Sequence, residues 1–285
     1  MARIAIMQGR LGPPEAGRFQ SFPREGWRTE FRSAAEAGLD AIEWIYDAFG
    51  DDVNPLGSDE GLREMKRLGA QDGVGVVSVC ADYFMDRPFL RVGDDELTRS
   101  INKLRWLLGR CEVAGITRAV LPFVDQSRIE NDSEVTRVVE VLGQVLPDAE
   151  RHGVELHLET ALGPAAFAAL LERVPHPYLK VNYDSGNSAS LGYRPREEFA
   201  AYGSRIGSVH IKDRVRGGGT VPLGHGDADL TAVFDGLHHL GYEGDYVLQV
   251  ARGEPHAEVA LARSNVAFVT GHLRRTAQTV EGGRR

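Results

Sequence analysis

Cysteine, basic charge and long apolar runs are what this sequence has least of. It contains two cysteines in 285 residues, too few for a disulfide framework or a structural zinc knuckle, which fits a reducing cytosol. Acidic residues outnumber Lys and Arg by 41 to 33, and the net charge of −8 argues against nucleic-acid binding. No apolar run approaches the roughly 20 residues that a membrane span needs, so no membrane partner is expected.

The residues near the two ends of the chain also allow structural predictions. The apolar run at residues 3–7 ends at Gln8, which is typical of a first strand and not of a signal peptide. With the low cysteine content, this predicts a cytoplasmic protein. Residues 276–285 have little apolar surface to bury, so we expect a flexible C-terminal tail there.

Short β-rich apolar runs alternate with amphipathic helical patterns along the whole chain. The expected strands are residues 3–7, 41–45, 75–80, 119–123, 154–159, 179–184, 207–211 and 246–250. Such β-then-α units with short connections predict an α/β fold, a single (β/α)8 TIM barrel over residues 1–275. An open doubly wound sheet is the competing fold, weakened because no G-x-G-x-x-G follows the first strand. The longest loops are expected after strands one, two, three and seven.

Side chains that suit a metal ion stand at the ends of four consecutive predicted strands: Glu159, Asp184, His210 and Gln249. The carboxyl ends of barrel strands meet at one rim, so these side chains are expected to converge. Carboxylate and imidazole groups suit a divalent cation, and the amide could add a carbonyl oxygen. Alternatively, acids at strand ends cap the next helix or pair with Lys and Arg, and spacing alone leaves both interpretations open.

A series of ordered motifs runs along nearly the whole chain. They are Met7-Gln8-Gly9-Arg10-Leu11, Gln20-Ser21-Phe22-Pro23, Ile42-Glu43-Trp44, Leu158-Glu159-Thr160, Val181-Asn182-Tyr183-Asp184-Ser185-Gly186-Asn187, Val209-His210-Ile211-Lys212-Asp213-Arg214, Gly241-Tyr242-Glu243-Gly244 and Leu248-Gln249-Val250-Ala251-Arg252. With these motifs in this order, the sequence resembles the sugar phosphate isomerase/epimerase superfamily, the xylose-isomerase-like TIM barrels. The motifs are fairly specific for the superfamily and identify no substrate.

The resemblance implies a metal-dependent enzyme. In this family four ligands, Glu, Asp, His and Glu, hold one divalent ion, and the matching positions are Glu159, Asp184, His210 and Gln249. Mn²⁺ is the expected ion, with Co²⁺, Mg²⁺, Zn²⁺ and Fe²⁺ as alternatives. The implied substrate is a keto- or aldo-sugar or a sugar phosphate, from which Glu159 takes a proton beside the carbonyl to give an enediolate. Homo-oligomers are common among such barrels, so one is expected here.

Gln249 departs from the family pattern. Its amide can ligate through oxygen but does not titrate, so it cannot act as a general base. The ligand charge changes from about −3 to about −2, which predicts weaker metal binding and a stronger Lewis acid. A single base, Glu159, suffices for aldose–ketose isomerisation or for starting a β-elimination, which modestly favours these reactions over a two-glutamate epimerase. A metal-bound water, Glu254 or Glu43 are alternative sources of the second proton.

Several functions therefore stay open at this point. The first is a sugar isomerase or epimerase, and the second a dehydratase or lyase acting on a keto-sugar, keto-inositol or keto-glycoside. A non-enzymatic sugar binder, inactive because Gln249 replaced a glutamate, is a weaker alternative. Phosphodiester hydrolysis in the manner of abasic-site endonucleases would need more metal ligands and a basic DNA surface, which this acidic chain lacks.

Further polar or aromatic residues near the strand ends are candidates for substrate contact. They are Gln8, Arg10, Glu43, Trp44, His157, Asn187, Arg214 and Arg252. Core burial is an equally good interpretation for Trp44 and His157. Arg214 opens a basic, glycine-rich segment, residues 214–220, which is either an anion site or a mobile loop tip.

Lys212 is the second candidate catalytic residue. It follows His210 by two residues, so both side chains point to the same face of the strand. Its ammonium could stabilise an enolate oxygen or orient Glu159, and pairing with Asp213 or a nearby acid is the alternative.

Overall fold

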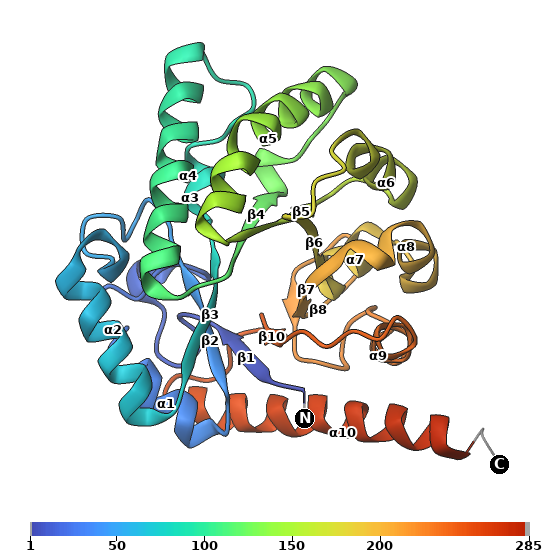
Figure 1. Cartoon of the computed structure of the whole chain (residues 1–285). Coiled ribbons are helices and arrows are strands. Elements are labelled where there is room, and N and C mark those ends of the chain that lie inside the picture. Colours follow the sequence, from blue (N-terminus) through green and yellow to red (C-terminus); the bar gives the residue numbers. More distant parts are fainter. Residues whose placement is uncertain (1, 283–285) are drawn as a thin grey trace.

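Eight parallel strands close into one barrel, and their order around it follows the chain (Figure 1). The computed structural model describes residues 2–282. The strands are β1 (Ile4–Met7), β2 (Ala41–Ile45), β3 (Gly75–Cys80), β4 (Arg118–Phe123), β5 (Glu155–Thr160), β6 (Leu179–Asp184), β7 (Ile206–Ile211) and β10 (Tyr246–Leu248). Strand β10 pairs in parallel with both β1 and β7, which closes the sheet. The predicted (β/α)8 TIM barrel of the α/β class is confirmed.

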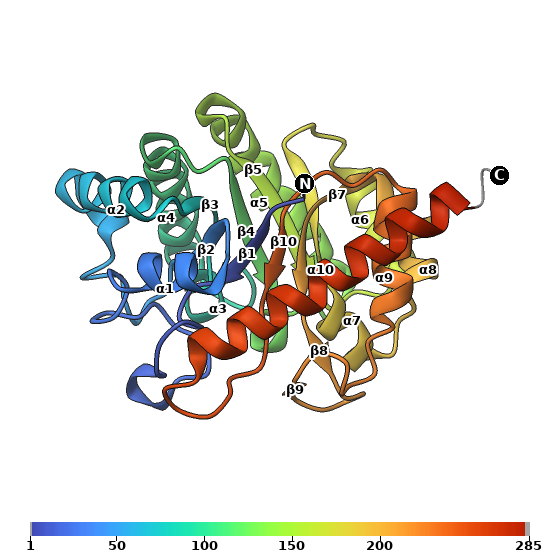
Figure 2. The same cartoon turned by 90° about the horizontal axis from the view of Figure 1, so that it is seen from below.

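Helices surround the strands and separate them along the chain (Figures 1 and 2). They are α1 (Glu30–Ala37), α2 (Asp59–Asp72), α3 (Tyr83–Asp86), α4 (Asp94–Ala114), α5 (Asp132–His152), α6 (Pro164–Arg173), α7 (Ser185–Leu191), α8 (Pro195–Tyr202), α9 (Leu230–His239) and α10 (Glu258–Gly282). Helix α10 runs along the outside of the barrel and packs against α1 and α9. Within the described residues, no helix is both long and apolar enough to cross a membrane.

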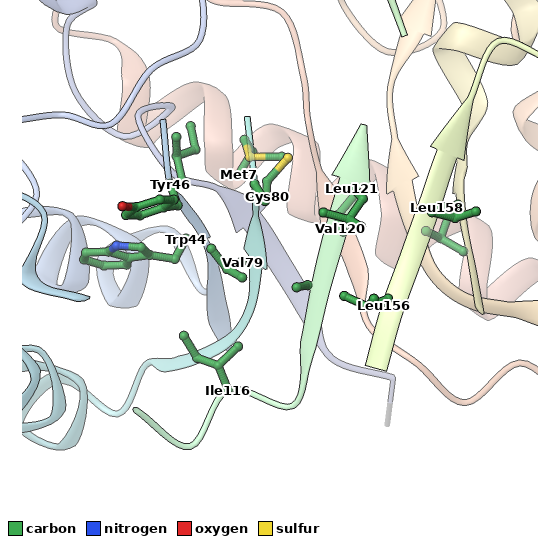
Figure 3. Packing of buried hydrophobic residues seen from close by; sticks show 14 of the residues in the cluster. Met7, Trp44, Tyr46, Val79, Cys80, Ile116, Val120, Leu121, Leu156 and Leu158 are labelled. Atoms are coloured by element: carbon green, nitrogen blue, oxygen red, sulfur yellow. The ribbon is translucent and has the colours of Figure 1, made fainter. Parts of the chain in front are cut away.

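Alternation along the strands divides side chains between the barrel interior and the layer under the helices. In β2, Glu43 points inward and meets His210, whereas Trp44 points outward and packs on Phe22 and Trp27 with ring centroids 5.8 and 5.7 Å apart. Figure 3 shows part of the resulting apolar core, which is continuous across β2, β3, β4 and β5. This alternation leaves the inward-facing Glu43 free to reach His210 inside the barrel.

The strand boundaries differ slightly from the expected ones. Strand β10 ends at Leu248, two residues before the predicted end, but the Gln249 N–H still donates to the Ile211 carbonyl at 3.1 Å. That bond extends the pairing with β7 by one residue. Gln249 is therefore held at the rim although it lies outside the regular strand.

Long loops follow β1, β2, β3 and β7, as the sequence predicts. The loop after β7 contains a short hairpin of β8 (Asp213–Arg214) and β9 (Thr220–Val221), joined by antiparallel pairing. Asp213 is fully buried, and its carboxylate accepts the N–H groups of Gly224 and Gly226, each at 2.9 Å. These bonds anchor the base of the loop, and the two interpretations of residues 214–220, an anion site or a mobile loop tip, stay predictions.

The boundary at residue 275 between barrel and tail stays a prediction. Helix α10 continues across it to Gly282, and the Thr276 hydroxyl is buried and donates to Asp235 at 3.0 Å. Residues 283–285 of the predicted tail lie outside the described residues.

Asp245, which precedes β10, is the buried acid of a cluster of charged side chains. Its carboxylate is 2% exposed, is 2.6 Å from the Arg3 Nε and also pairs with Arg118, which is itself largely buried. Asp245→Asn leaves the Arg118 guanidinium without its counter-ion, so we expect the free energy of unfolding to fall by about 3 kcal/mol. Urea unfolding measures this loss. The matched variant Glu197→Gln removes an exposed pair with Arg194, and a comparable loss there would contradict the argument.

Candidate metal and active site

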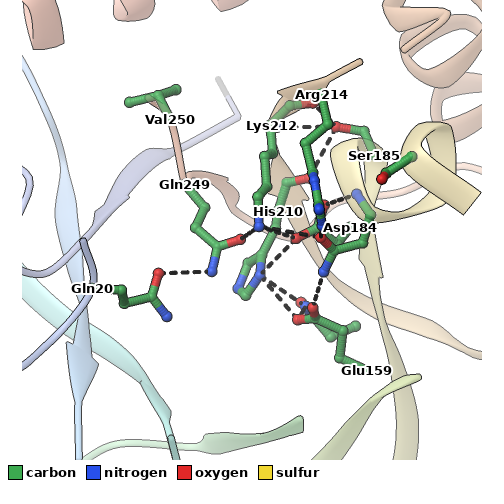
Figure 4. Close-up of polar contacts among 12 residues, drawn as sticks. Gln20, Glu159, Asp184, Ser185, His210, Lys212, Arg214, Gln249 and Val250 are labelled. Carbon is green, nitrogen blue, oxygen red and sulfur yellow. Dashed lines mark hydrogen bonds and ion pairs between the residues drawn. The ribbon is translucent and has the colours of Figure 1, made fainter. Parts of the chain in front are cut away.

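Three buried side chains at the ends of neighbouring strands cluster at one rim of the barrel (Figure 4). Glu159 comes from β5, Asp184 from β6 and His210 from β7, and one donor atom of each lies within 4.8 Å of the others. His210 Nδ1 is 3.3 Å from Glu159 Oε2 and 3.9 Å from Asp184 Oδ2. The structure therefore brings together three of the four predicted ligands.

The other ring nitrogen of His210 is bonded to Glu43. Nε2 lies 2.5 Å from Glu43 Oε1, and both side chains are fully buried. Burial alone would lower the pKa of His210, but the carboxylates of Glu43 and Glu159 outweigh it and raise that pKa to about 10. Burial also opposes ionisation of Glu43, yet the adjacent imidazolium holds the pKa of Glu43 below its usual value. Glu43 thus turns the ring so that Nδ1 faces the two acids, an arrangement common behind metal-binding histidines.

Two asparagines fix the Glu159 carboxylate. Asn182 Nδ2 donates to Oε2 at 2.8 Å, and Asn187 Nδ2 donates to Oε1 at 2.6 Å. Burial opposes ionisation here too, but hydrogen bonding to His210 and the charge of Lys212 keep the pKa of Glu159 below its usual value. Glu159 is therefore an ionised carboxylate in a fixed orientation.

The Lys212 ammonium links this cluster to Gln249. Its Nζ lies 3.4 Å from Asp184 Oδ2, 3.3 Å from Asn187 Oδ1 and 3.0 Å from Gln249 Oε1 (Figure 4). The other end of the Gln249 amide donates from Nε2 to Gln20 Oε1 at 3.1 Å. Because Lys212 engages the Gln249 oxygen, ligation of a metal by Gln249 stays a prediction.

The donor set fits a divalent cation. Two carboxylates and an imidazole are hard to borderline ligands of the kind that bind Mn²⁺, Mg²⁺ or Zn²⁺. Ligands of one ion lie at most about 4.2 Å apart, twice a metal–ligand distance of about 2.1 Å. The separations of 3.3 and 3.9 Å from His210 Nδ1 already meet that limit. Lys212 opposes a cation here, because its ammonium lies 3.4 Å from the Asp184 oxygen.

A cavity of about 240 Å³ opens beside Glu159. The predicted site residues that line it are Glu159, Asn187, Lys212, Arg214 and Gln249. Arg214 Nη1 donates to Asn187 Oδ1 at 2.7 Å, so its guanidinium is held at the cavity wall. The wall built by the loops after β1, β2, β3 and β4 carries Arg18, Phe19, Gln20, Asp47, Asp82, Met85, Asp86, Asp125 and Gln126.

Trp44 and His157 lie away from this cavity. The indole of Trp44 is fully buried in the layer outside the barrel and donates from Nε1 to Asn54 at 3.1 Å. His157 is fully buried inside the barrel, with its ring nitrogens 2.7 Å from Ser208 and 3.0 Å from Glu155. Both positions match the core interpretation and not substrate contact.

Gln8, Arg10 and Arg252 bond to backbone groups at or near the loop after β1. Gln8 accepts the backbone N–H of Ile45 at 2.9 Å, while Arg10 and Arg252 each donate to the Phe19 carbonyl at 2.9 Å. They support the segment that carries Arg18, Phe19 and Gln20 to the cavity, and they do not themselves line it.

The sequence reasoning missed Gln20 and Asp82 as cavity residues. Gln20 comes from the loop after β1, and Asp82 lies two residues beyond the end of β3. A signal for Asp82 was available, because it lies two residues after a barrel strand and so belongs to the same rim as Lys212, which directly follows β7. Gln20 carried no comparable signal, since only the folded loop places it there.

The chain belongs to the xylose isomerase-like TIM barrel family, whose model matches residues 31–270. Among known proteins, it is similar to L-ribulose-5-phosphate 3-epimerase UlaE of Salmonella heidelberg (strain SL476). The two are 27% identical over 256 residues, which cover 84% of this chain and 88% of that protein. The predicted superfamily is therefore confirmed.

Solved structures of low identity share the fold. An L-ribulose 3-epimerase is 20% identical with a TM-score of 0.77, covering 99% of this chain and 97% of that one. A xylose isomerase-like TIM barrel protein from Mycobacterium smegmatis, solved in complex with magnesium, is 17% identical with a TM-score of 0.72, covering 97% and 98%. The prediction of an enzyme in the sugar isomerase and epimerase class is supported by these relatives.

Proposed function

We propose that the protein is a divalent-metal-dependent epimerase or isomerase of a keto- or aldo-sugar or sugar phosphate, with Glu159 as the base. The observation that carries this proposal is the fixed, ionised Glu159 carboxylate at the wall of the cavity, beside Asp184 and His210. The relatives named as ribulose and ribulose-phosphate 3-epimerases support an epimerase. Their names include free and phosphorylated sugars, so phosphorylation of the substrate stays open.

The metal would be held by Glu159, Asp184 and His210, with Gln249 as a neutral fourth ligand. When bound, the ion supplies a Lewis acid for the carbonyl and adjacent hydroxyl oxygens of the substrate. We propose Mn²⁺ as the ion, with Co²⁺, Mg²⁺, Zn²⁺ and Fe²⁺ as alternatives. Lys212 uses one lone pair of Gln249 Oε1, and the second lone pair of that oxygen would be available to the ion.

The reaction begins with proton transfer to Glu159. Its carboxylate takes the proton from the carbon beside the carbonyl, and the bonding electrons form the carbon–carbon double bond of an enediolate. Lys212, whose ammonium lines the cavity, supplies positive charge to the developing oxyanion. Asn187 and Arg214 offer hydrogen bonds to substrate hydroxyl groups from the same wall.

The second candidate is a dehydratase or lyase that shares the first proton transfer. The amide at Gln249 favours this candidate, because an amide cannot act as a base and elimination needs no second base on the opposite face of the enediolate. Its unsaturated product would absorb in the ultraviolet.

Homo-oligomerisation and a cytoplasmic location remain predictions from the sequence.

Hydrogen–deuterium exchange by NMR tests the proposal. The Mn²⁺-loaded protein is incubated in D₂O with L-ribulose, L-ribulose 5-phosphate, other ketoses and keto-inositols, with a chelated sample as control. We expect deuterium at the carbon beside the carbonyl of at least one substrate, and loss of that exchange after chelation. The recovered product distinguishes an epimer, an aldose–ketose isomer and an alkene. Tight binding of a sugar without exchange would instead identify the protein as a sugar binder.

A further inference from the structure

The amide of Gln249 has a fixed direction. Its oxygen accepts from Lys212 Nζ at 3.0 Å, so its nitrogen must face the other way, and Nε2 donates to Gln20 Oε1 at 3.1 Å (Figure 4). Arg10 Nη2 donates to that same Gln20 oxygen, also at 3.1 Å. Two donors thus meet the Gln20 oxygen, which leaves its nitrogen to face the opposite side.

The chain of hydrogen bonds ends on a carboxylate. Gln20 Nε2 donates to Asp82 Oδ2 at 2.7 Å, and the Cys80 thiol donates to Asp82 Oδ1 at 3.2 Å. Each link from Lys212 through Gln249 and Gln20 has one defined donor and one acceptor, so the terminal group must accept. A glutamate at position 249 could only accept. The Gln20 amide would then have to donate to residue 249 and would turn its oxygen towards Asp82.

Asp82 is the cavity acid best placed to carry a proton. It lines the same cavity as Glu159 and forms no ion pair with any residue in the described part of the chain. Asp47 is committed to the backbone N–H groups of Phe22 and Gly50, at 2.8 and 2.7 Å. The two remaining aspartates of the opposite wall, Asp86 and Asp125, are exposed.

The pKa of Asp82 suits proton transfer near neutral pH. Burial raises the pKa of Asp82 to about 6, against the hydrogen bonds from Gln20 and Cys80, and the nearby charges of Asp47 and Glu159 raise it further. A group with such a pKa is populated in both forms near neutrality, as a general acid or base requires.

We propose that Asp82 is the second proton-carrying group of the epimerisation, in place of the glutamate that Gln249 replaces in the family pattern. This proposal rests on the proposed function. Glu159 takes a proton from one face of the substrate carbon, and the electron pair of the broken C–H bond passes into the enediolate. The Asp82 carboxyl group then delivers a proton to the opposite face, and a new C–H bond forms as the carbonyl is restored. Exchange with water returns a proton to Asp82 and removes one from Glu159, so the substrate is isomerised without net change in composition.

The strand order agrees with this assignment. Asp82 follows β3 and Glu159 is the last residue but one of β5, so the β4 strand and its Pro122, which also lines the cavity, lie between them. The two carboxyl groups therefore approach a bound substrate from different positions on the rim. Gln249 and Gln20 occupy the side of the rim near β10 and β1, which is where the amide chain to Asp82 begins.

Asp82→Asn separates the two proton transfers. With a ketose that the wild type epimerises in D₂O, we expect epimer formation to fall at least about 100-fold, the usual contribution of a general acid or base. Exchange of the substrate's own hydrogen should continue within about tenfold, because Glu159 still removes it and returns deuterium to the same face. Asp82→Glu, which keeps a carboxyl group, should recover part of the epimerisation, and Asp59→Asn is the matched control at an exposed aspartate that does not line the cavity.

The outcomes distinguish this proposal from the proposed function. Epimerisation by Asp82→Asn within tenfold of wild type, with exchange intact, overturns the role of Asp82 and leaves the function standing. Equal loss of exchange and epimerisation in Asp82→Asn, with an unchanged melting temperature, also overturns it, because Asp82 would then act before or during the first transfer. A wild type that exchanges hydrogen but forms only an alkene or an aldose overturns it as well. Absence of exchange in the metal-loaded wild type overturns the proposed function and this proposal together.

Discussion

Glu159→Gln is expected to lower the rate of substrate hydrogen exchange by about 1,000-fold, because an amide cannot accept the proton that the carboxylate takes. The side chain keeps its size, so the cavity should keep its shape. Its hydrogen bonds do not survive intact, however. Asn182 and Asn187 each donate to one Glu159 oxygen, and a glutamine would offer one of them an NH₂ group instead. The variant also removes one negative charge from the metal site, so its metal affinity is expected to fall.

Two measurements keep these effects apart. The exchange rate is determined by NMR in D₂O at a metal concentration that saturates the variant, as established by titration. Glu155→Gln is the matched control on the same strand, because Glu155 is partly exposed and bonds to His157 at 3.0 Å, and neither residue lines the cavity. Exchange by saturated Glu159→Gln within tenfold of wild type would show that another group is the base.

The fold was predictable from the sequence because the barrel repeats one signal many times. Each β-then-α unit carries an apolar run, an amphipathic stretch and often a glycine at the helix end, such as Gly115 and Gly153, which adopt positive φ values of 82° and 65°. An error of two residues at the end of β10 leaves that pattern unchanged. The cluster of Glu159, Asp184 and His210 was predictable for the same reason, since strand ends share a rim.

Residues on loops and on the two faces of a strand were harder to place. Glu43 and Trp44 are adjacent in β2, so they must point in opposite directions, and only one of them could face the barrel axis. Strand alternation therefore argued against treating both as substrate contacts. Gln20 and Asp82 meet at 2.7 Å although 62 residues separate them, a contact that depends on the path of two loops. No periodic pattern encodes such a path, which is why Gln20 was not predicted as a cavity residue.

Metal affinity is expected to rise about tenfold for each pH unit between pH 6 and 8, or about 100-fold in all. In the metal-free protein the carboxylates of Glu43 and Glu159, acting against burial, raise the pKa of His210 to about 10. Below that pH the imidazole is protonated on both nitrogens, and the Nδ1 proton must leave before this atom can bind a cation. Each unit of pH raises the deprotonated fraction of His210 tenfold, so the metal affinity must increase as the pH rises.

Calorimetric titration with Mn²⁺ in buffers of different ionisation enthalpy measures both the affinity and the protons released, for which we expect about one per ion at pH 7. Glu43→Gln removes a carboxylate that raises the His210 pKa, so the release should fall below one proton and the pH dependence should flatten. It should also weaken binding at pH 8 by about 10- to 100-fold, because the amide supports the imidazole less well than a carboxylate does. His239→Gln is the control, because His239 is exposed on α9, and it should keep the wild-type slope. A wild-type affinity that does not change between pH 6 and 8 would mean that no proton competes with the metal, which would contradict a protonated His210 in the metal-free protein.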